Sequence, residues 1–429
     1  MLCLEFKQTR MQNYTKKHIK SLRPSATLAI NEKCKELRAD GKKVFNFGFG
    51  GSPFSIPDKI VSALKNNAHK KEYLPSVGLK DLREAITKYI NQNSNSSRPV
   101  NWHTNFRQED IIIGPGTKQL MFLLQLGFEG EFIFPTGSWV SYEPQAIIAK
   151  NKVHWLETFR EDNWFPKPEQ IEEKIKSIKN KNIILFLNSP NNPTGAVCKN
   201  LKEIAEVAKK HKIIILSDEI YTQLQFDEKY NSISEYYPEG TIISSGLSKW
   251  LGAGGWRLGF FAVPDKLRNI LEMIKILSSE SLSAVSAPIQ YAAVEAFSND
   301  YSDYLSKTRN ILSSVGNYVY DKLKSNKVLI TPPQGGFYIM PEFLNSKFKT
   351  SQQMCDDILN KTGVALLPGS DFGFKKNKML ARLSYTDFDG DLLLKNISGS
   401  KKLDNDFIEK YAPNIVEGTK KLVEWSKSL

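Results

Sequence analysis

Short apolar runs alternate with amphipathic stretches along the first two thirds of the chain. Each apolar run is followed by a polar or glycine-rich loop, and the next stretch has the spacing of a helix with one apolar face. Such runs are typical of strands buried on both faces, and their alternation with helices indicates an α/β fold with a mostly parallel sheet. The clearest predicted strands are residues 111–113, 132–134, 183–187, 213–216 and 241–243.

The pattern changes after residue 263. Long helical patterns cover residues 266–276, 288–297 and 303–324, and a smaller α/β unit follows, ending in a helix near residues 415–426. A chain of 429 residues is long enough for one large and one smaller core, so we expect two lobes. Because ligands bind beyond the carboxyl ends of parallel strands, the polar loops after the predicted strands are expected to form one shared site.

The composition is that of a soluble globular protein, with 41% hydrophobic and 24% charged residues. The net charge of +13 comes from lysines scattered along the sequence, and no basic stripe alternates with aromatic residues. The sequence therefore predicts no nucleic-acid partner. A basic surface would favour anionic substrates by long-range steering.

The four cysteines, Cys3, Cys34, Cys198 and Cys355, lie far apart and lack the spacing of metal ligands. They suggest free thiols in a reducing compartment, and no metal site is expected. No apolar run has the length of a membrane helix. The N-terminal arm lacks the apolar segment of a secretory signal, so we expect a cytoplasmic protein. The arm is also basic and poor in acid, which fits a short organellar presequence, and Met11 is an alternative start.

The stretch from Ser244 to Phe260 follows a predicted strand and contains the most unusual lysine of the sequence. Lys249 stands among small hydroxyl and glycine residues, and Arg257 follows it. A second cation that cannot lose its proton, together with partial burial, would lower the pKa of Lys249 and expose a neutral amine, as a Schiff-base lysine requires. A surface lysine in a glycine-rich loop explains the same pattern equally well.

Further motifs lie at predicted strand ends. Residues 114–118 join a strand to a helix start, where backbone N–H groups form an anion-binding cup, although an ordinary βα turn explains this motif alone. Asp218 follows a core strand, so its carboxylate needs a cationic partner such as a protonated ring nitrogen; the alternative is a helix N-cap. Tyr221 lies one helical turn later. Trp139 offers either a stacking face or core packing.

Together these motifs make the chain resemble the class I/II aminotransferases, which are fold-type-I pyridoxal-phosphate enzymes, and in particular the bacterial aspartate and aspartate/prephenate subgroup. The resemblance covers nearly the whole chain, and its most specific parts are residues 192–195 (Asn-Pro-Thr-Gly), 217–221 (Ser-Asp-Glu-Ile-Tyr) and 248–259. It implies a seven-stranded, mostly parallel sheet and a homodimer with shared active sites. It also implies an N-terminal arm (1–22), a large cofactor-binding domain (58–315) and a small α/β domain built from both chain ends (23–57 and 316–429).

The resemblance further implies roles around the ring of pyridoxal 5′-phosphate. Lys249 would hold the cofactor as a Schiff base and then shuttle the Cα proton of the substrate. Asp218 would keep the pyridine nitrogen protonated, so that the ring acts as an electron sink. Asn192 and Tyr221 would hydrogen-bond the phenolic oxygen, and Trp139 would stack on the ring.

Other residues are expected at the substrate and phosphate ends. Arg382 would grip the substrate α-carboxylate with two hydrogen bonds, helped by the amide of Asn192 and a backbone N–H near Gly51, beside the ring of Trp139. The phosphate would be bound by Gly116, Thr117, Lys118, Ser245 and Arg257, with Tyr73 reaching in from a partner subunit.

Two departures from the family pattern stand out. Gly246 occupies a position where relatives often carry a serine, which weakens the phosphate cup, and Ser245 is expected to compensate. Residues 387–404 resemble an insertion to which the sequence assigns no role.

Substrate preference depends on fewer residues. Arg23 precedes the Pro-Ser-Ala-Thr motif at 24–27, where the aspartate/prephenate subgroup carries a basic residue that helps bind the distal carboxylate, although a surface position explains Arg23 as well. The expected reaction moves an amino group from aspartate to 2-oxoglutarate with ping-pong kinetics. The alternatives are an aminotransferase for aromatic or other amino acids and a carbon–sulfur β-lyase. An aminotransferase-like regulator is not expected, because the residues before this motif are too few for a DNA-binding head.

Overall fold

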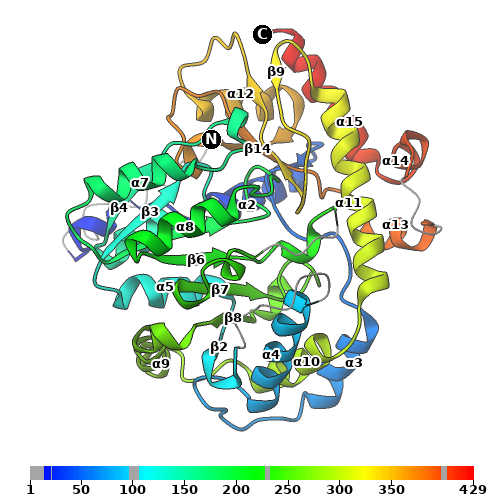
Figure 1. Cartoon of the computed structure of the whole chain (residues 1–429). Coiled ribbons are helices and arrows are strands. Elements are labelled where there is room, and N and C mark those ends of the chain that lie inside the picture. Colours follow the sequence, from blue (N-terminus) through cyan, green and yellow to red (C-terminus); the bar gives the residue numbers. More distant parts are fainter. Residues whose placement is uncertain (1–13, 21, 96–105, 228–231, 398–402) are drawn as a thin grey trace.

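The structure is a computed structural model that describes residues 14–20, 22–95, 106–227, 232–397 and 403–429. Its centre is a seven-stranded sheet in the order β2-β8-β7-β6-β5-β3-β4 (Figure 1). Only β8 runs antiparallel to its neighbours, so the predicted α/β fold with a mostly parallel sheet is confirmed. The strands are β2 (Ile111–Gly114), β3 (Glu131–Pro135), β4 (Lys152–Leu156), β5 (Ile183–Asn188), β6 (Ile214–Asp218), β7 (Thr241–Gly246) and β8 (Gly259–Ala262).

Helices cover both faces of this sheet. Successive side chains of each strand point to opposite faces, and here both sets are apolar and need to be buried. Ile133 of β3 packs into one helical layer, and its neighbour Phe132 packs into the other. In Figure 1, α7 and α8 lie above the sheet, whereas α5 and α9 lie below it. The first layer consists of α7 (Pro168–Ser177) and α8 (Leu201–His211), and the second of α5 (Thr117–Gly127), α6 (Tyr142–Ala149) and α9 (Arg268–Ser281).

A third group of helices packs beside β2, at the edge of the sheet. The contacts of α10 with α3 and α4 hold this group together, and α4 also touches β2. The long α11 follows and leads the chain to its C-terminal part (Figure 1). These helices are α3 (Asp58–Asn67), α4 (Lys80–Asn95), α10 (Ala287–Ser298) and α11 (Ser302–Leu323).

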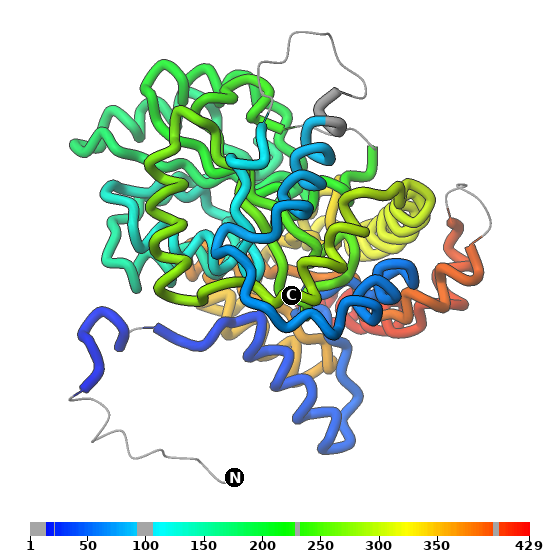
Figure 2. The backbone as a smooth tube through the Cα atoms, turned by 90° about the horizontal axis from the view of Figure 1, so that it is seen from below, coloured from blue at the N-terminus to red at the C-terminus, as the bar shows by residue number. Residues whose placement is uncertain are grey.

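The two ends of the chain pack against each other. β1 (Phe45–Asn46) pairs in parallel with β12 (Val364–Ala365), and α2 (Ala26–Ala39) touches both β1 and β13 (Leu367–Pro368). Figure 2 shows this blue N-terminal helix beside the orange C-terminal segment. The remaining elements of this part are β9 (Val328–Leu329), β10 (Tyr338–Ile339), β11 (Glu342–Phe343), α12 (Ser351–Thr362), β14 (Ala381–Ser384), α13 (Gly390–Asn396), α14 (Asn405–Tyr411) and α15 (Pro413–Lys427).

Several elements differ from the sequence prediction. The strand β7 continues past the predicted residue 243 to Gly246. Part of the expected insertion at residues 387–404 packs against the N-terminal segment, because Oδ2 of Asp387 accepts hydrogen bonds from the backbone N–H of Asn46 (2.8 Å) and from Arg38 (3.3 Å). Residues 398–402 and most of the predicted arm, with Cys3 and Met11, lie outside the described residues.

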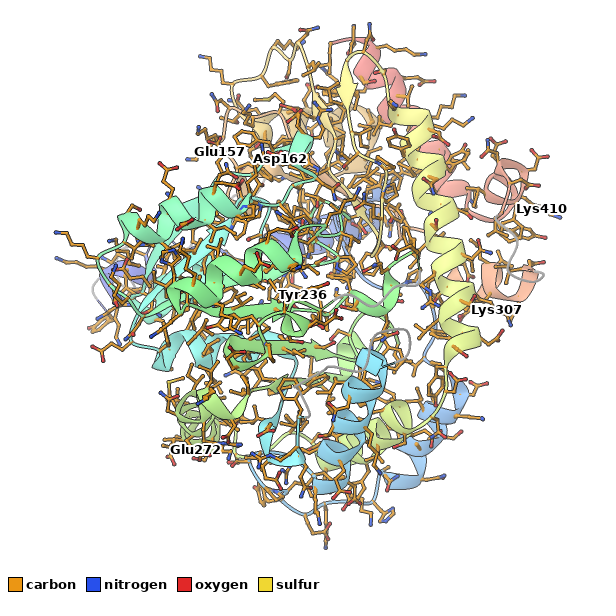
Figure 3. All side chains as sticks on the ribbon, in the orientation of Figure 1. Glu157, Asp162, Tyr236, Glu272, Lys307 and Lys410 are labelled. Carbon is orange, nitrogen blue, oxygen red and sulfur yellow. The ribbon has the colours of Figure 1, made fainter. Side chains whose placement is uncertain are left out.

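Charged side chains lie over the surface of the described chain rather than on one face. Glu272, Lys307 and Lys410 project from helices on different sides of the molecule in Figure 3. Cys34, Cys198 and Cys355 are buried and free. Within the described ranges, no helix combines the length and the apolar character needed to cross a membrane.

Candidate active site

The carboxyl ends of β5, β6 and β7 open onto a cavity of about 600 Å³. This is the place at which a parallel sheet is expected to bind a ligand. Most of the predicted site residues line this cavity, although they come from segments far apart in the sequence. They are Gly51, Thr117, Lys118, Trp139, Asn192, Asp218, Tyr221, Lys249, Arg257 and Arg382.

Lys249 enters the cavity from the loop that follows β7. Its ammonium nitrogen donates a hydrogen bond to the carbonyl oxygen of Gly50 (2.9 Å) and lies 5.5 Å from the ring centroid of Tyr221. Gly50 also packs closely on Tyr338, because a Cβ at this position would lie 1.9 Å from the hydroxyl of Tyr338. Lys249 is therefore a half-buried amine facing a cavity, and the alternative of a fully solvated surface lysine does not describe it.

Asp218 ends β6 and is buried in the floor of the cavity. Its Oδ2 accepts a hydrogen bond from the hydroxyl of Tyr142 (2.6 Å), and its backbone oxygen accepts one from Asn188 (2.8 Å). Burial raises the pKa of Asp218 to about 6, and the hydrogen bond from Tyr142 opposes that rise. Among the described residues, Oδ1 of Asp218 has no hydrogen-bond partner. A buried carboxylate with one open oxygen is a fitting partner for a protonated ring nitrogen.

Arg382 forms the opposite wall of the cavity and is also buried. Its guanidinium donates to Oδ1 of Asn192 (3.1 Å) and to the carbonyl oxygen of Gly48 (2.5 Å), and its carbon lies 4.6 Å from the ring centroid of Tyr338. Within the described part of the chain, Nε of Arg382 has no partner. A buried guanidinium that is bonded only to neutral groups is a strong site for a carboxylate.

The start of α5 forms the third wall. Arg257 donates to the carbonyl oxygens of Gly254 (2.7 Å) and Pro115 (3.2 Å), beside Gly116. Gly116 has φ of +85°, and a Cβ there would lie 2.3 Å from Nη2 of Arg257. Lys118 lies 5.6 Å from the ring centroid of Trp139, and burial together with the charge of Arg257 lowers the pKa of Lys118. A helix start flanked by two cations fits an anion such as a phosphate.

Four predicted residues lie outside the lining of the cavity: Gly116, which borders it beside Arg257, and Ser245, Arg23 and Tyr73. The hydroxyl of Ser245 donates to the backbone oxygen of Glu219 (3.4 Å), inside the sheet. Arg23 is exposed, and its charge acts on Asp371, whose pKa is raised to about 6 by burial. Tyr73 is 92% exposed; because its predicted role belongs to a partner subunit, its place in one chain does not test that role.

A second cavity of about 440 Å³ lies beyond the ends of β3 and β4, where Glu157 is labelled in Figure 3. Its walls combine aromatic and charged side chains, and it contains none of the predicted site residues. Its lining includes Trp155, Phe159, Trp164 and Phe374, with Lys375 paired to Glu157 (3.2 Å) at its edge. The chemistry predicted from the sequence therefore belongs to the larger cavity.

Comparison with known proteins decides the family. The family model described as "Aminotransferase class I and II" matches residues 42–391. The chain belongs to the class I and II aminotransferases. The aspartate aminotransferase of Geobacillus stearothermophilus is 35% identical over 386 residues, which cover 86% of this chain and 93% of that protein. That of Bacillus subtilis (strain 168) is 33% identical over 413 residues, covering 92% and 99% respectively.

Solved structures of aminotransferases agree with this assignment. An aspartate aminotransferase from Thermus thermophilus with maleate has a TM-score of 0.80 and 25% identity, and the match covers 96% of this chain and 99% of that one. An aromatic aminotransferase from Pyrococcus horikoshii OT3 has a TM-score of 0.76 and 27% identity, with 92% and 99% covered. The chain is thus an aminotransferase that depends on pyridoxal 5′-phosphate and acts on amino acids and 2-oxo acids.

The residues of the cavity fit this cofactor. The open oxygen of Asp218 suits the ring nitrogen, the start of α5 with Lys118 and Arg257 suits the phosphate, and Lys249 suits the aldehyde carbon. When bound, pyridoxal 5′-phosphate supplies an electron sink that weakens the Cα–H bond of the amino acid.

Sequence reasoning missed several residues of the aminotransferase site. Asn188 directly follows the predicted strand 183–187 and was assigned no role, although its side chain donates to the backbone oxygen of Asp218 (2.8 Å) and accepts from the backbone N–H of Asn192 (2.7 Å). Tyr142 begins α6, and only its contact with Asp218 distinguishes it from a core tyrosine. Also missed were Ser25, Thr27, Leu28, Phe49, Ser248 and Tyr338, which line the cavity.

Proposed function

We propose that this aminotransferase moves the amino group of a dicarboxylic L-amino acid, with L-aspartate as the preferred donor, to 2-oxoglutarate in a ping-pong reaction. The observation that carries this proposal is the charge of the cavity. Among the described lining residues, four are basic (Lys118, Lys249, Arg257 and Arg382) and one, Asp218, is acidic. A phosphate and two substrate carboxylates would match this excess of positive charge. The aspartate aminotransferases at 33–35% identity support the same substrates.

In this proposal, Arg382 binds the α-carboxylate with N–H groups that Asn192 and Gly48 do not engage, among them that of Nε, and the hydrogen bond to Asn192 fixes the plane of the guanidinium. Lys249 would then take the proton from the Cα of the amino acid in the first half-reaction and deliver a proton to the carbonyl-derived Cα of the 2-oxo acid in the second. Its hydrogen bond to Gly50 and the rings of Tyr221 and Phe337 limit the positions of the amine before substrate enters. Asn192 and Tyr221 hydrogen-bond the phenolic oxygen of the cofactor, and Trp139 stacks on its ring.

We also propose the expected domain division, with residues 58–315 as the large domain and residues 23–57 and 316–429 as the small one. The pairing of β1 with β12 and the contacts of α15 with β1 support a small domain made from both chain ends. A homodimer in which Tyr73 reaches the phosphate of the partner subunit is part of the same proposal. Free cysteines support a reducing, cytoplasmic setting.

A panel of amino donors tests this function. The purified enzyme is given 2-oxoglutarate and one amino acid at a time, and glutamate is measured. We expect kcat/KM for L-aspartate to exceed that for L-phenylalanine by at least about tenfold. A higher value for aromatic donors would replace aspartate by an aromatic substrate, and pyruvate released from cystathionine without any acceptor would instead indicate a β-lyase.

A further inference from the structure

The carboxylate of Asp218 is held asymmetrically in the floor of the cavity. Oδ2 accepts the hydroxyl hydrogen of Tyr142 at 2.6 Å, whereas Oδ1, equally buried, has no partner in the described structure. Both side chains are buried, so loss of this hydrogen bond would leave Oδ2 without its protein donor, at a cost in free energy. Because the hydrogen bond fixes Oδ2, the carboxylate cannot rotate freely about its Cβ–Cγ bond. The orientation of Oδ1 is therefore fixed as well.

Tyr142 is itself fixed by rings on several sides. Its ring centroid lies 4.9 Å from that of Phe186 and 5.8 Å from that of Phe134, both in the core of the sheet. Trp139 meets it edge to face at 5.6 Å, with an angle of 85° between the ring planes. The tyrosine thus contacts both the acid and the aromatic ring that are assigned to the cofactor, and its hydroxyl is committed to Asp218.

We propose that Tyr142 is a positioning residue for the cofactor: its hydroxyl occupies Oδ2 of Asp218, keeps that side chain a carboxylate, and presents Oδ1 to the ring nitrogen. This inference rests on the proposed assignment of Asp218 to that nitrogen. Tyr142 touches neither substrate nor the reacting carbon, and it acts through Asp218.

The charges around Asp218 agree with this role. Burial and the charge of Asp218 raise the pKa of Tyr142, so the tyrosine keeps its proton and donates it. The titratable groups that face Asp218 are Tyr142 from α6, the neighbouring Glu219, Tyr221 and Lys249. The hydroxyl of Tyr142, the backbone N–H of Ile220 and the charge of Lys249 lower the pKa of Asp218, whereas Glu219 raises it. Without the hydroxyl of Tyr142, Asp218 would be protonated at a higher pH and would offer less charge to a cationic ring.

Cofactor binding to the full-length protein tests the proposal without relying on turnover. The cofactor is removed, pyridoxal 5′-phosphate is titrated back, and its Kd is measured by absorption between pH 6 and pH 9. Tyr142→Phe keeps the ring that packs on Phe134 and Phe186. We expect it to raise Kd about tenfold near pH 6.5, with a smaller increase at pH 9, where Asp218 ionises even without help.

Two further variants separate positioning from packing. Tyr237→Phe removes the hydroxyl of another buried tyrosine outside the cavity lining, and it should leave Kd unchanged. In the Asp218→Asn background, adding Tyr142→Phe should change Kd by less than about twofold, because the carboxylate that it positions is gone.

The proposal is overturned if Tyr142→Phe binds the cofactor as the wild type does, or if its effect is the same at every pH or persists in full beside Asp218→Asn. If Asp218→Asn alone leaves Kd unchanged, the assignment of Asp218 fails and the inference fails with it. The donor preference is not measured in these titrations, so a wrong substrate proposal gives a different result from a wrong role for Tyr142.

Discussion

The floor of the cavity is formed by the ends of β5, β6 and β7, whereas its rim is formed by α2 and the residues just before it. On the floor, Asp218, Tyr142 and Asn188 are buried and joined by hydrogen bonds of 2.6 and 2.8 Å. At the rim, Leu28 is 54% exposed, and Arg23 is exposed as well. The floor therefore has one fixed arrangement that suits chemistry common to all substrates, while the rim has weakly held side chains that suit discrimination between them.

Removal of the amine on the floor should have the largest effect. Lys249→Ala is expected to lower kcat by at least about 10⁴, because it removes both the attachment point of the cofactor and the group that moves the Cα proton. Activity is measured with L-aspartate and 2-oxoglutarate, and the residue labelled after borohydride reduction is found by mass spectrometry. Lys266→Ala, an exposed lysine, is the control and should keep full activity. Label on a lysine other than Lys249 would refute the assignment.

Replacement of the buried guanidinium of Arg382 should have the second largest effect on activity. Arg382→Lys keeps a positive charge but loses the planar pair of donors, and it should lower kcat/KM about a thousandfold for every amino acid tested. The Kd of the cofactor should stay within about twofold of the wild type. Arg268→Lys changes an arginine outside the cavity and should leave kcat/KM unchanged. A loss confined to dicarboxylic substrates would show that Arg382 binds the distal group instead.

The stability of the cofactor-free protein should depend on Asp218 and on pH. The ordinary pKa of this carboxyl is 3.8, and burial raises it to about 6 in the folded protein. Between these values the folded state binds more protons than the unfolded state, so the contribution of Asp218 to stability falls as the pH rises from about 4 to about 6 and stays low above that.

Asp218→Asn removes this unfavourable charge. Without cofactor, the variant should be more stable than the wild type at pH 8 by a free energy on the order of 2 to 3 kcal/mol, and equally stable near pH 4. Urea denaturation at the two pH values measures the difference. Added pyridoxal 5′-phosphate should favour the wild type, and a variant that is less stable than the wild type at pH 8 without cofactor would contradict this account.

The smallest effect is expected at the rim. Arg23 is exposed, and exposed charges contribute little because water and salt screen them. Arg23→Ala should raise KM for aspartate and 2-oxoglutarate about threefold to fivefold and should leave KM for phenylalanine unchanged. Lys17→Ala, an exposed lysine nearby in the chain, is the control. Equal changes for both classes of substrate would remove Arg23 from the specificity argument.

The contrast between the floor and the rim of the cavity also explains which site residues could be predicted from the sequence. Asp218 and Lys249 follow apolar strands, and parallel strands bring their carboxyl ends to one edge, so order along the chain was enough to group them. Tyr142 carries no such signal, because its role depends on where its ring packs between Phe134 and Phe186. Arg23 could be chosen from sequence only by resemblance, since no strand or helix fixes its side chain.

Other differences have similar causes. Ser245 was expected at the phosphate, but it lies within β7, which continues beyond the predicted strand to Gly246, and its hydroxyl is directed to the backbone of Glu219. Tyr73 depends on a second chain, which the pattern of one chain does not describe. The sheet itself was predictable because its strands are short apolar runs, while the strand β4, with its partly buried residues, lacks that pattern.

The pairing of Phe45 with Val364 has a consequence for how the enzyme is made. The segments that carry Asp218 and Lys249 leave the ribosome well before Arg382 and β12 do. The strand β1 is synthesised early, but it can pair only after β12 has been made. In the nascent chain, the floor of the cavity can therefore form before Arg382, which is proposed to bind the substrate carboxylate, has been synthesised. Contacts so distant in sequence form late and slowly, so competence for catalysis should be the final event in the maturation of this polypeptide.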